Sequence, residues 1–289
     1  MRVMTTPTLT QSRKNRNQVV VPSSFRLTKH TRQTLATLAE YFCVRTNDAA
    51  LIIRDRTPNE NDKRTLRFTL KLLHKAGLAN RIPYLDLERE SGGVAYVYGL
   101  SDKGVRYCRD LYDGRMKTFD DHSQRTLDHE LEISLFHIAL KKLCAKRNLT
   151  LYWQQDDLKC TVNPDAMFAI TDPSKPEGKN TFYYFLEIER AKMGHYIDGE
   201  SSIMRKLGKF YEYYGTEKCR KEWGVEQFRV VVVQRTADKR YNLLAALNRQ
   251  FNHRMFWLTT EQLYKEDIGA AIFKTPKDHP ERSYSFFEA

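Results

Sequence analysis

The residues with the clearest potential for chemistry are three carboxylates near the middle of the chain. Asp165 follows Asn163-Pro164, and Glu187 and Glu189 lie two residues apart in an apolar stretch. Alternate residues of a strand face the same side, so Glu187 and Glu189 should project together. If the two segments pair as a hairpin, Asp165 lies opposite them. Such a group needs a cation, and carboxylate oxygens suit Mg²⁺ or Mn²⁺, so the spacing predicts a divalent metal site.

These three acids also have an interpretation without chemistry. An Asp after Asn-Pro is typical of a turn, and Glu187 and Glu189 could be the solvated face of an edge strand, paired with Arg190 or Lys192. The opposite face of the strand is apolar and is expected to be buried: Phe182, Tyr184, Leu186 and Ile188.

The elements that would position the acids follow one another as in an α/β domain. The spacing of apolar residues predicts helices over 127–145, 200–214 and 238–251. Strands are predicted over 149–153, around Asp165, and over 181–191, 228–233 and 255–258. The continuous apolar run at 228–233 is typical of an interior strand. This order predicts a central mixed sheet.

The first third of the chain has a different pattern. Helices are predicted over 31–42, 48–53 and 62–76, the last ended by Gly77. Two strands over 79–84 and 94–98, joined through Ser91-Gly92-Gly93, and a short helix from about 100 follow. We interpret this order as an N-terminal winged helix-turn-helix. The predicted division is a disordered basic arm at 1–23, the winged helix at 24–112, a linker at 113–125 and the α/β domain at 126–289.

The helix predicted over 62–76 has an apolar face with Leu66, Leu70 and Leu73. Its basic residues are Lys63, Arg64, Arg67, Lys71 and Lys75. In a winged helix this is the recognition helix, and the basic residues would contact phosphates and the major groove of DNA. A solvated helix face is the simpler alternative, and some winged helices bind proteins instead.

Composition favours an anionic partner. The 289 residues carry a net charge of +12, which is typical of proteins that bind nucleic acid or an anionic surface. No apolar run approaches the ~20 residues that span a bilayer, and the basic start does not match a secretory signal. The five cysteines are odd in number and show no C-x-x-C spacing. A zinc site or disulfide framework is therefore disfavoured, and a reducing cytoplasm is expected.

Pro164-Asp165 and Glu187-Ile188-Glu189, in this order of elements, resemble the PD-(D/E)xK restriction-endonuclease-like fold. Glu189 departs from that motif, because it occupies the position usually held by lysine. With a winged helix ahead of it, the chain from about 24 to 260 resembles the MobC-type relaxases of plasmids and their replication-relaxation relatives. The segment Asp128-His129-Glu130-Leu131 is also similar to that group.

This resemblance implies site- and strand-specific DNA nicking at an origin of transfer during plasmid mobilisation. It implies Mg²⁺ or Mn²⁺ at Asp165, Glu187 and Glu189, duplex and single-stranded DNA as substrate, and a coupling ATPase and other relaxosome proteins as partners. Such a metal would polarise the scissile phosphate and help to ionise an attacking water.

Several further residues have candidate roles beside that metal. Lys206 or Lys209 could stabilise the phosphate in the transition state, with Lys192 as a third candidate. Lys206 and Lys209 could also be contacts to the DNA backbone or plain surface residues. Glu130 could reach the metal site, although a helix-surface position is simpler. His137 lies beside the apolar face of its helix and is expected in the core.

Two other functions stay open at this point. The chain could be a non-catalytic winged-helix replication or relaxosome factor, which the glutamate at position 189 favours. It could also be a double-strand endonuclease of a mobile element. No two of the eight histidines are separated by a single residue, which disfavours relaxases with a His-hydrophobic-His metal motif. Nothing singles out one of the 16 tyrosines as a nucleophile, so water and tyrosine both remain candidates.

Overall fold

The structure is a computed structural model. It describes residues 25–54, 57–85, 94–109, 111–112, 116–120, 123–155, 158, 160–189, 203–225, 227–278 and 282–287. The chain divides into two compact units, Met1–Leu135 and Phe136–Ala289. The predicted arm at 1–23, the turn Ser91-Gly92-Gly93 and Lys192 lie outside the described residues.

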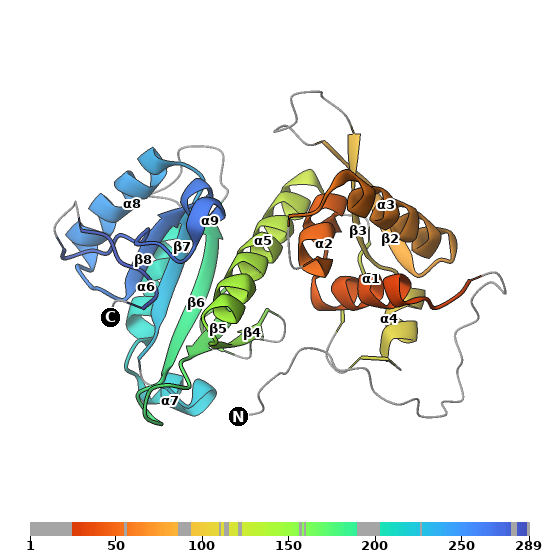
Figure 1. Cartoon of the computed structure of the whole chain (residues 1–289). Helices are drawn as coiled ribbons and strands as arrows, with labels where there is room; N and C mark the ends of the chain where they lie inside the picture. Colours follow the sequence, from red (N-terminus) through yellow and green to blue (C-terminus); the bar gives the residue numbers. More distant parts are fainter. Residues whose placement is uncertain are drawn as a thin grey trace. The chain divides into compact units, whose positions relative to one another are not determined.

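The first unit combines helices with a small antiparallel sheet (Figure 1). Its elements are α1 (Lys29–Glu40), β1 (Val44–Arg45), α2 (Thr46–Ile53), α3 (Glu60–Lys75), β2 (Ala79–Leu85), β3 (Val94–Leu100) and α4 (Asp102–Arg109). The strand order is β1-β3-β2, and both pairings are antiparallel. The helices and strands predicted from the sequence are all present. Strand β1 was missed because two residues show no periodicity.

Local chemistry explains where α3 begins and ends. The Asn59 side chain accepts a hydrogen bond from the backbone of Asp62, whose own side chain accepts from the backbone of Asn59. This capping box starts the helix two residues earlier than the sequence predicted. At the other end Gly77 has a φ of +73°, a left-handed conformation that glycine adopts readily. The leucines of the predicted apolar face are buried: Leu66, Leu70 and Leu73.

Helix α5 (Gln124–Lys146) runs across the division between the two units. Its first turns belong to the first unit, because Leu127 and Leu131 pack in a cluster with Val97 and Phe119. The predicted linker at 113–125 overlaps the start of this helix by two residues. Phe119, inside the predicted linker, is fully buried, so apolar burial begins earlier in the chain than the polar composition of that segment indicated.

The second unit is built on one mixed sheet. Its strands are β4 (Thr150–Gln154), β5 (Ala166–Thr171), β6 (Thr181–Glu189), β7 (Arg229–Gln234) and β8 (Phe256–Thr260). They lie in the order β4-β5-β6-β7-β8. Strands β4, β5 and β6 pair antiparallel, whereas β6, β7 and β8 pair parallel. The predicted α/β class with a central mixed sheet is confirmed.

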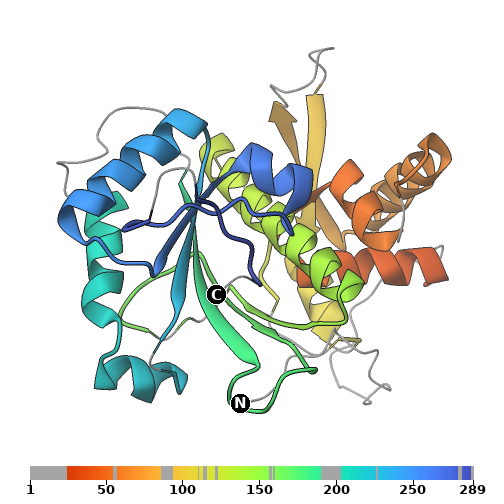
Figure 2. The ribbon, with the colours of Figure 1, turned by 60° about the vertical axis from the view of Figure 1, so that its left-hand side comes forward.

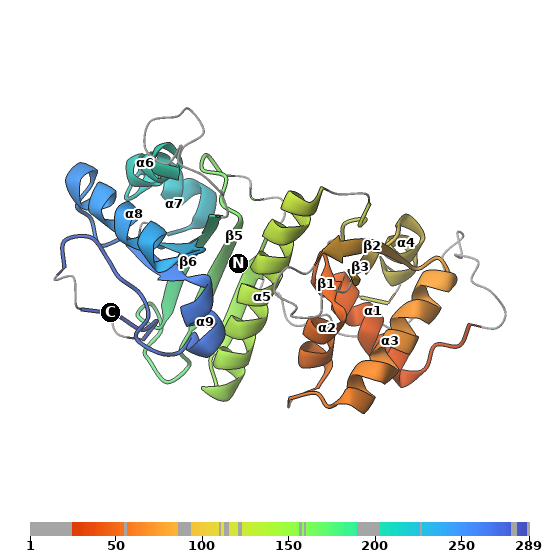
Figure 3. The same ribbon diagram turned by 90° about the horizontal axis from the view of Figure 1, so that it is seen from above.

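Helices cover both faces of this sheet. On one face lie α6 (Ile203–Tyr213) and α8 (Ala237–Gln250), and on the other lie α9 (Glu261–Asp267) and the second half of α5 (Figures 2 and 3). Phe185 of β6 packs with Leu207 and Phe210 of α6 on the first face. Phe136 of α5 packs against Phe168 and Tyr264 on the second. A short helix, α7 (Glu217–Trp223), was not predicted.

No helix of the described ranges is both long enough and apolar enough to cross a membrane.

Candidate functional site

Backbone pairing between β5 and β6 places Asp165 opposite Glu187. The strands pair antiparallel with Ala166 opposite Leu186, so the next position along brings Asp165 beside Glu187. The Asp165 N–H donates to the carbonyl of Leu186 at 3.0 Å, and the Ile188 N–H donates to Asp165 Oδ2 at 2.7 Å. These two bonds fix the carboxylate of Asp165 at the end of the strand pair. The hairpin that the sequence predicted is present.

Helix α6 places Lys206 against both acids. Its Nζ contacts Glu187 Oε2 and lies 3.5 Å from Asp165 Oδ1. The helix is held there by apolar residues buried against the sheet: Ile203, Met204, Leu207 and Phe210. Lys209 lies one turn further along and is exposed. Of the two lysines proposed from the sequence, Lys206 is therefore the one that lies between the carboxylates.

Burial controls the charge state of this cluster. Removal of Glu187 from water raises the pKa of its carboxyl, the charge of Asp165 raises it further, and Lys206 opposes both. Burial alone would lower the pKa of Lys206, but the charges of Glu187 and Asp165 outweigh it and raise that pKa. Lys206 is thus held as a cation. Glu187 is only 2% exposed, so a negative charge on its carboxylate costs free energy unless a cation lies beside it.

The donor atoms fit a hard divalent cation. Glu187 Oε1 is buried and has no hydrogen-bond partner in the part of the chain that the structure describes. Mg²⁺ typically binds one or two protein carboxylates and keeps several waters or substrate phosphates. Asp165 and Glu187 meet that requirement. Within the described ranges, no three His, Cys, Asp or Glu side chains are grouped closely enough to hold a metal.

Glu189 lies next along the same face of β6 and is half-buried. Its role as a third metal ligand stays a prediction. In the parallel register of β6 and β7 its neighbour is Gln234, which is fully buried. The sequence analysis missed Gln234. The signal was available, since Gln234 is the first polar residue after the apolar run Val230–Val233, at the strand end that adjoins the acids.

The other residues named from the sequence lie in different settings. His137 is 7% exposed and its ring stacks on Trp153, with centroids 4.2 Å apart. Burial, with a smaller effect of Lys141, lowers the pKa of His137 to about 3, so the prediction of a core histidine is confirmed. Glu130 lies in the first unit, where its charge helps to raise the pKa of Cys43 after the larger effect of burial.

The basic residues of α3 form a second candidate site, in the first unit. Arg64, Arg67, Lys71 and Lys75 are exposed. Lys63 is half-buried, and its Nζ lies 2.7 Å from Glu60 Oε1, whereas Arg67 lies 3.3 Å from the other oxygen of Glu60. Glu60 therefore offsets part of the charge at the start of the helix. The cations toward its end have no such acid in the ion pairs of the described residues.

Two apolar side chains of α3 are also exposed, and the sequence analysis missed them. Phe68 is 63% exposed and Leu72 is 38% exposed. They are four residues apart and so lie on one face of the helix. That face also carries Arg64 and Lys75, four residues before Phe68 and three after Leu72. Large apolar residues left in water beside cations indicate a contact surface.

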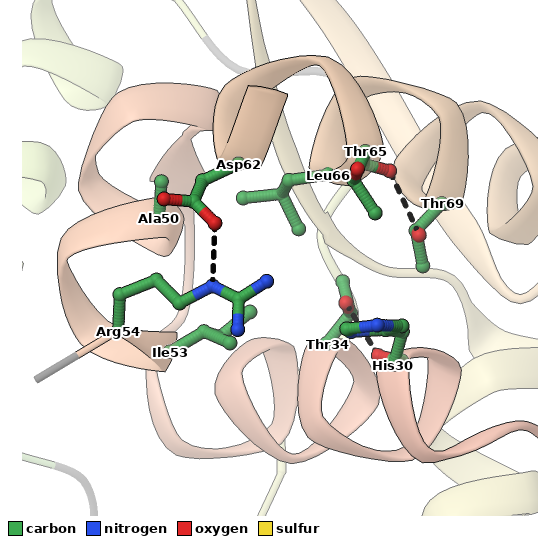
Figure 4. Close-up of a pocket in the computed structure, with 9 residues that line it drawn as sticks. All are labelled: His30, Thr34, Ala50, Ile53, Arg54, Asp62, Thr65, Leu66 and Thr69. Carbon is green, nitrogen blue, oxygen red and sulfur yellow. Dashed lines mark hydrogen bonds and ion pairs between the residues drawn. The ribbon is translucent and has the colours of Figure 1, made fainter. Parts of the chain in front are cut away.

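A small cavity between α1, α2 and α3 is lined by His30, Thr34, Arg54, Asp62 and Thr69, among others (Figure 4). Arg54 Nε lies 3.0 Å from Asp62 Oδ1 across it, which ties the end of α2 to the first turn of α3. The cavity holds about 20 Å³, comparable with a single water molecule. It helps to fix α3 and is too small for a ligand site.

Comparison with known proteins identifies the family. A family model described as replication-relaxation matches residues 27–227, which include α3, Asp165, Glu187 and Lys206. No curated protein matches the chain, and no solved structure does either. Because the match covers well over half of the 289 residues, the chain belongs to the replication-relaxation family.

Proposed function

We propose that this protein is a metal-dependent nickase that cuts one strand of plasmid DNA at an origin of transfer. Membership of the replication-relaxation family suggests a role in the replication or relaxation of plasmids. The observation that carries the proposal is the cluster of Asp165, Glu187 and Lys206 at the end of β5 and β6. Two acids that could hold a metal and one lysine that could stabilise negative charge, gathered at the ends of neighbouring strands, suit hydrolysis of a phosphodiester.

The arrangement of strands supports a variant of the PD-(D/E)xK fold. In the motif, one strand carries the first acid and the next carries an acid, any residue and a lysine. Here Glu189 occupies the lysine position of β6, while α6 brings Lys206 to the acids. We propose that the lysine function has moved to the helix, which leaves Glu189 available as a further oxygen ligand.

In the proposed site, the acids bind the metal and the lysine stabilises negative charge on the phosphate. Asp165 and Glu187 would hold Mg²⁺ or Mn²⁺, which when bound polarises the scissile phosphate and lowers the pKa of an attacking water. The Ile188 N–H orients the Asp165 carboxylate through its 2.7 Å hydrogen bond. Lys206 would donate its N–H groups to the phosphate oxygens as negative charge develops on them. The burial of Glu187 keeps bulk water from weakening these interactions.

We propose further that the first unit is a winged helix that brings the duplex to the protein through α3. Arg64, Lys71 and Lys75 are exposed and suit phosphate contacts. Phe68 and Leu72 lie among them, and apolar side chains in the major groove contact the methyl group of thymine. The exposed apolar face therefore favours a target site that contains thymine.

A plasmid assay tests the nickase proposal. Supercoiled plasmid that carries the protein's own origin is incubated with Mg²⁺, with Mn²⁺ or with a chelator. We expect open-circle product that requires the metal and the origin. Asp165→Asn should abolish it, because the amide can still accept from Ile188 N–H but carries no charge. Glu177→Gln, an exposed acid in the turn between β5 and β6, is the matched control and should nick normally. Linear product would indicate a double-strand endonuclease.

A second function is favoured by a specific observation. Lys206 already lies against both carboxylates that a metal would bind and offsets part of their charge, as expected of a domain that serves only as a scaffold for DNA binding. Titration of the protein with Mn²⁺, measured by calorimetry, distinguishes the nickase from the non-catalytic DNA-binding factor. A metal that binds wild-type protein and not Asp165→Asn supports the nickase. Absence of metal binding and of any cleavage, with DNA binding intact, would establish the non-catalytic factor instead.

A further inference from the structure

A large cavity lies in the second unit, away from the acids. It holds about 590 Å³ and is lined by three arginines, one acid and two aromatic rings: Arg229, Arg254, Arg282, Asp278, Trp257 and Tyr284. A volume of this order is typical of ligand sites rather than of packing defects. Three guanidinium groups against one carboxylate also make the cavity strongly positive.

The cavity lies at the opposite end of the strands from the proposed metal centre. Arg229 is the first residue of β7, and Trp257 is the second residue of β8, whereas Glu187 and Gln234 lie near the ends of β6 and β7. Arg229 also points to the other face of the sheet, because Val230 and Val232 of the same strand pack on the face that carries Glu187. The cavity is thus a separate site.

Its single carboxylate is already satisfied. The Asp278 carboxylate accepts hydrogen bonds from Arg254 Nη2 at 2.5 Å, from the Thr275 hydroxyl at 2.9 Å and from the Tyr284 hydroxyl at 2.8 Å. These three contacts hold the Asp278 carboxylate in place. No ion pair joins Arg229 or Arg282 to a carboxylate among the described residues, so in that part of the chain two positive charges of the cavity have no ion-pair partner.

Aromatic rings hold both of these guanidinium groups in position. Arg229 lies 4.4 Å above the ring of Trp257, and its Nη1 donates to the Tyr184 hydroxyl at 3.1 Å. Arg282 lies 4.8 Å above the ring of Tyr284. A guanidinium has five N–H donors, and only one of those on Arg229 is used in the hydrogen bonds of the described residues. Planar, preoriented arginines with open donors suit bidentate binding of phosphate.

We infer that this cavity binds the phosphodiester backbone of a nucleic acid strand, as a second DNA contact remote from Asp165 and Glu187. The backbone is favoured over the bases, because Trp257 is 3% exposed and covered by Arg229, and Arg282 lies over the ring of Tyr284, so a guanidinium group lies over each of the two rings. The net charge of +12 for the chain favours a polyanion over a single small anion. The site is independent of whether the acid cluster cuts DNA.

Fluorescence anisotropy with labelled single-stranded and duplex oligonucleotides tests the inference on the full chain. The cavity variants are made in a background protein that already carries Lys71→Ala/Lys75→Ala. These two changes weaken DNA binding by α3, so the contribution of the cavity can be measured. In that background Arg282→Gln and Arg229→Gln should each weaken DNA binding by at least about threefold. Each should also reduce the slope of log affinity against log salt by about 0.7–0.9, the change expected when one phosphate is no longer neutralised by the protein.

Matched variants make the result decisive. Arg282→Lys retains the charge and should retain most of the affinity, and Lys218→Gln on exposed α7 should behave as the background does. Circular dichroism establishes that each variant is folded. Inorganic phosphate and pyrophosphate are the free-anion competitors. Unchanged affinity and slope in both cavity variants would overturn the inference, and so would pyrophosphate binding that the arginine variants abolish while DNA binding stays unaffected. Binding is measured with a chelator and without divalent metal, so the result does not depend on nicking.

Discussion

The chemistry proposed for the second unit depends on one lysine that the strand motif does not contain. Asp165 and Glu187 lie side by side, and the buried Glu187 has an oxygen without a hydrogen bond in the described part of the structure. Lys206 supplies the cation that these two acids require. In the proposed nickase, the same lysine would stabilise the fold of the free protein and would act on phosphate when a metal is bound.

Replacement of Lys206 tests its contribution to stability. In Lys206→Met the carboxylate of Glu187 stays buried without its cation. We expect the free energy of unfolding in urea to fall by about 1–3 kcal/mol, less than for a fully buried pair because the Lys206 side chain is 35% exposed. The double variant Glu187→Gln/Lys206→Met removes the charge of Glu187 together with its cation and should lose less. Equal losses in the single and double variants would contradict this interpretation.

His137 provides a prediction about pH. Its pKa is about 3 in the folded protein against 6.5 for the free side chain, because it is buried on Trp153 and lies near Lys141. Below pH 6.5 the unfolded chain binds a proton that the folded chain does not, so this stability is complete above pH 6.5 and is lost as pH falls toward 3. Wild type should lose about 2–3 kcal/mol more than His137→Phe between pH 6.5 and 4.5. If the free energy of urea unfolding changed with pH in the same way for wild type and His137→Phe, this prediction would be contradicted.

At the scale of the element, α3 contains cations of two kinds. Lys63 is tied to Glu60 at 2.7 Å, while Lys71 and Lys75 are exposed near the other end of the helix. An exposed pair contributes little to stability, but it lowers the positive charge that the helix offers to a phosphate. The charge available to DNA is therefore concentrated in the later turns, around Phe68 and Leu72.

This difference within α3 makes a testable prediction. Lys71→Ala/Lys75→Ala should weaken duplex binding and reduce its salt slope by about 1.8, that is, about 0.9 for each phosphate that the helix no longer neutralises. Lys63→Ala should have a smaller effect, because Glu60 already offsets that charge. Fluorescence anisotropy of labelled duplex at several salt concentrations distinguishes the effect of Lys63→Ala from that of the double variant. Equal slopes for wild type and the double variant would exclude α3 as the DNA-contacting helix.

Periodicity and turn chemistry predicted most elements of both units, because apolar spacing is a property of the local sequence. The α3 apolar face, the end at Gly77 and the β5–β6 hairpin follow directly from it. The residues that lie beside the acids could not be predicted in this way. Which lysine of α6 meets Glu187, and that Gln234 lies beside Glu189, are set by helix packing and by the parallel register of β6 and β7. Sequence spacing along one strand carries no information about either.

At the scale of the whole molecule, the two candidate sites lie in different compact units. The exposed cations of α3 belong to Met1–Leu135, and Asp165, Glu187 and Lys206 belong to Phe136–Ala289. Neither set contributes to the core of the other unit, so each can be removed without disturbing the other. Recognition of the origin and cleavage of the strand should then be separable by mutation.

The pair Asp165→Asn and Lys71→Ala/Lys75→Ala tests that separation in one experiment. Asp165→Asn should bind origin duplex with wild-type affinity and fail to nick it, because it removes a proposed metal ligand and no DNA-binding cation. Lys71→Ala/Lys75→Ala should nick origin plasmid slowly at low protein concentration. At saturating protein its rate should recover while its preference for origin over non-origin plasmid falls, because the cations that position the duplex through its phosphates are missing and the acids are intact. Nicking rates measured on both plasmids across a protein titration give both quantities. If the α3 variant stayed inactive at saturation while folded, α3 would be required for the cleavage step itself, and the division of labour between the units would be wrong.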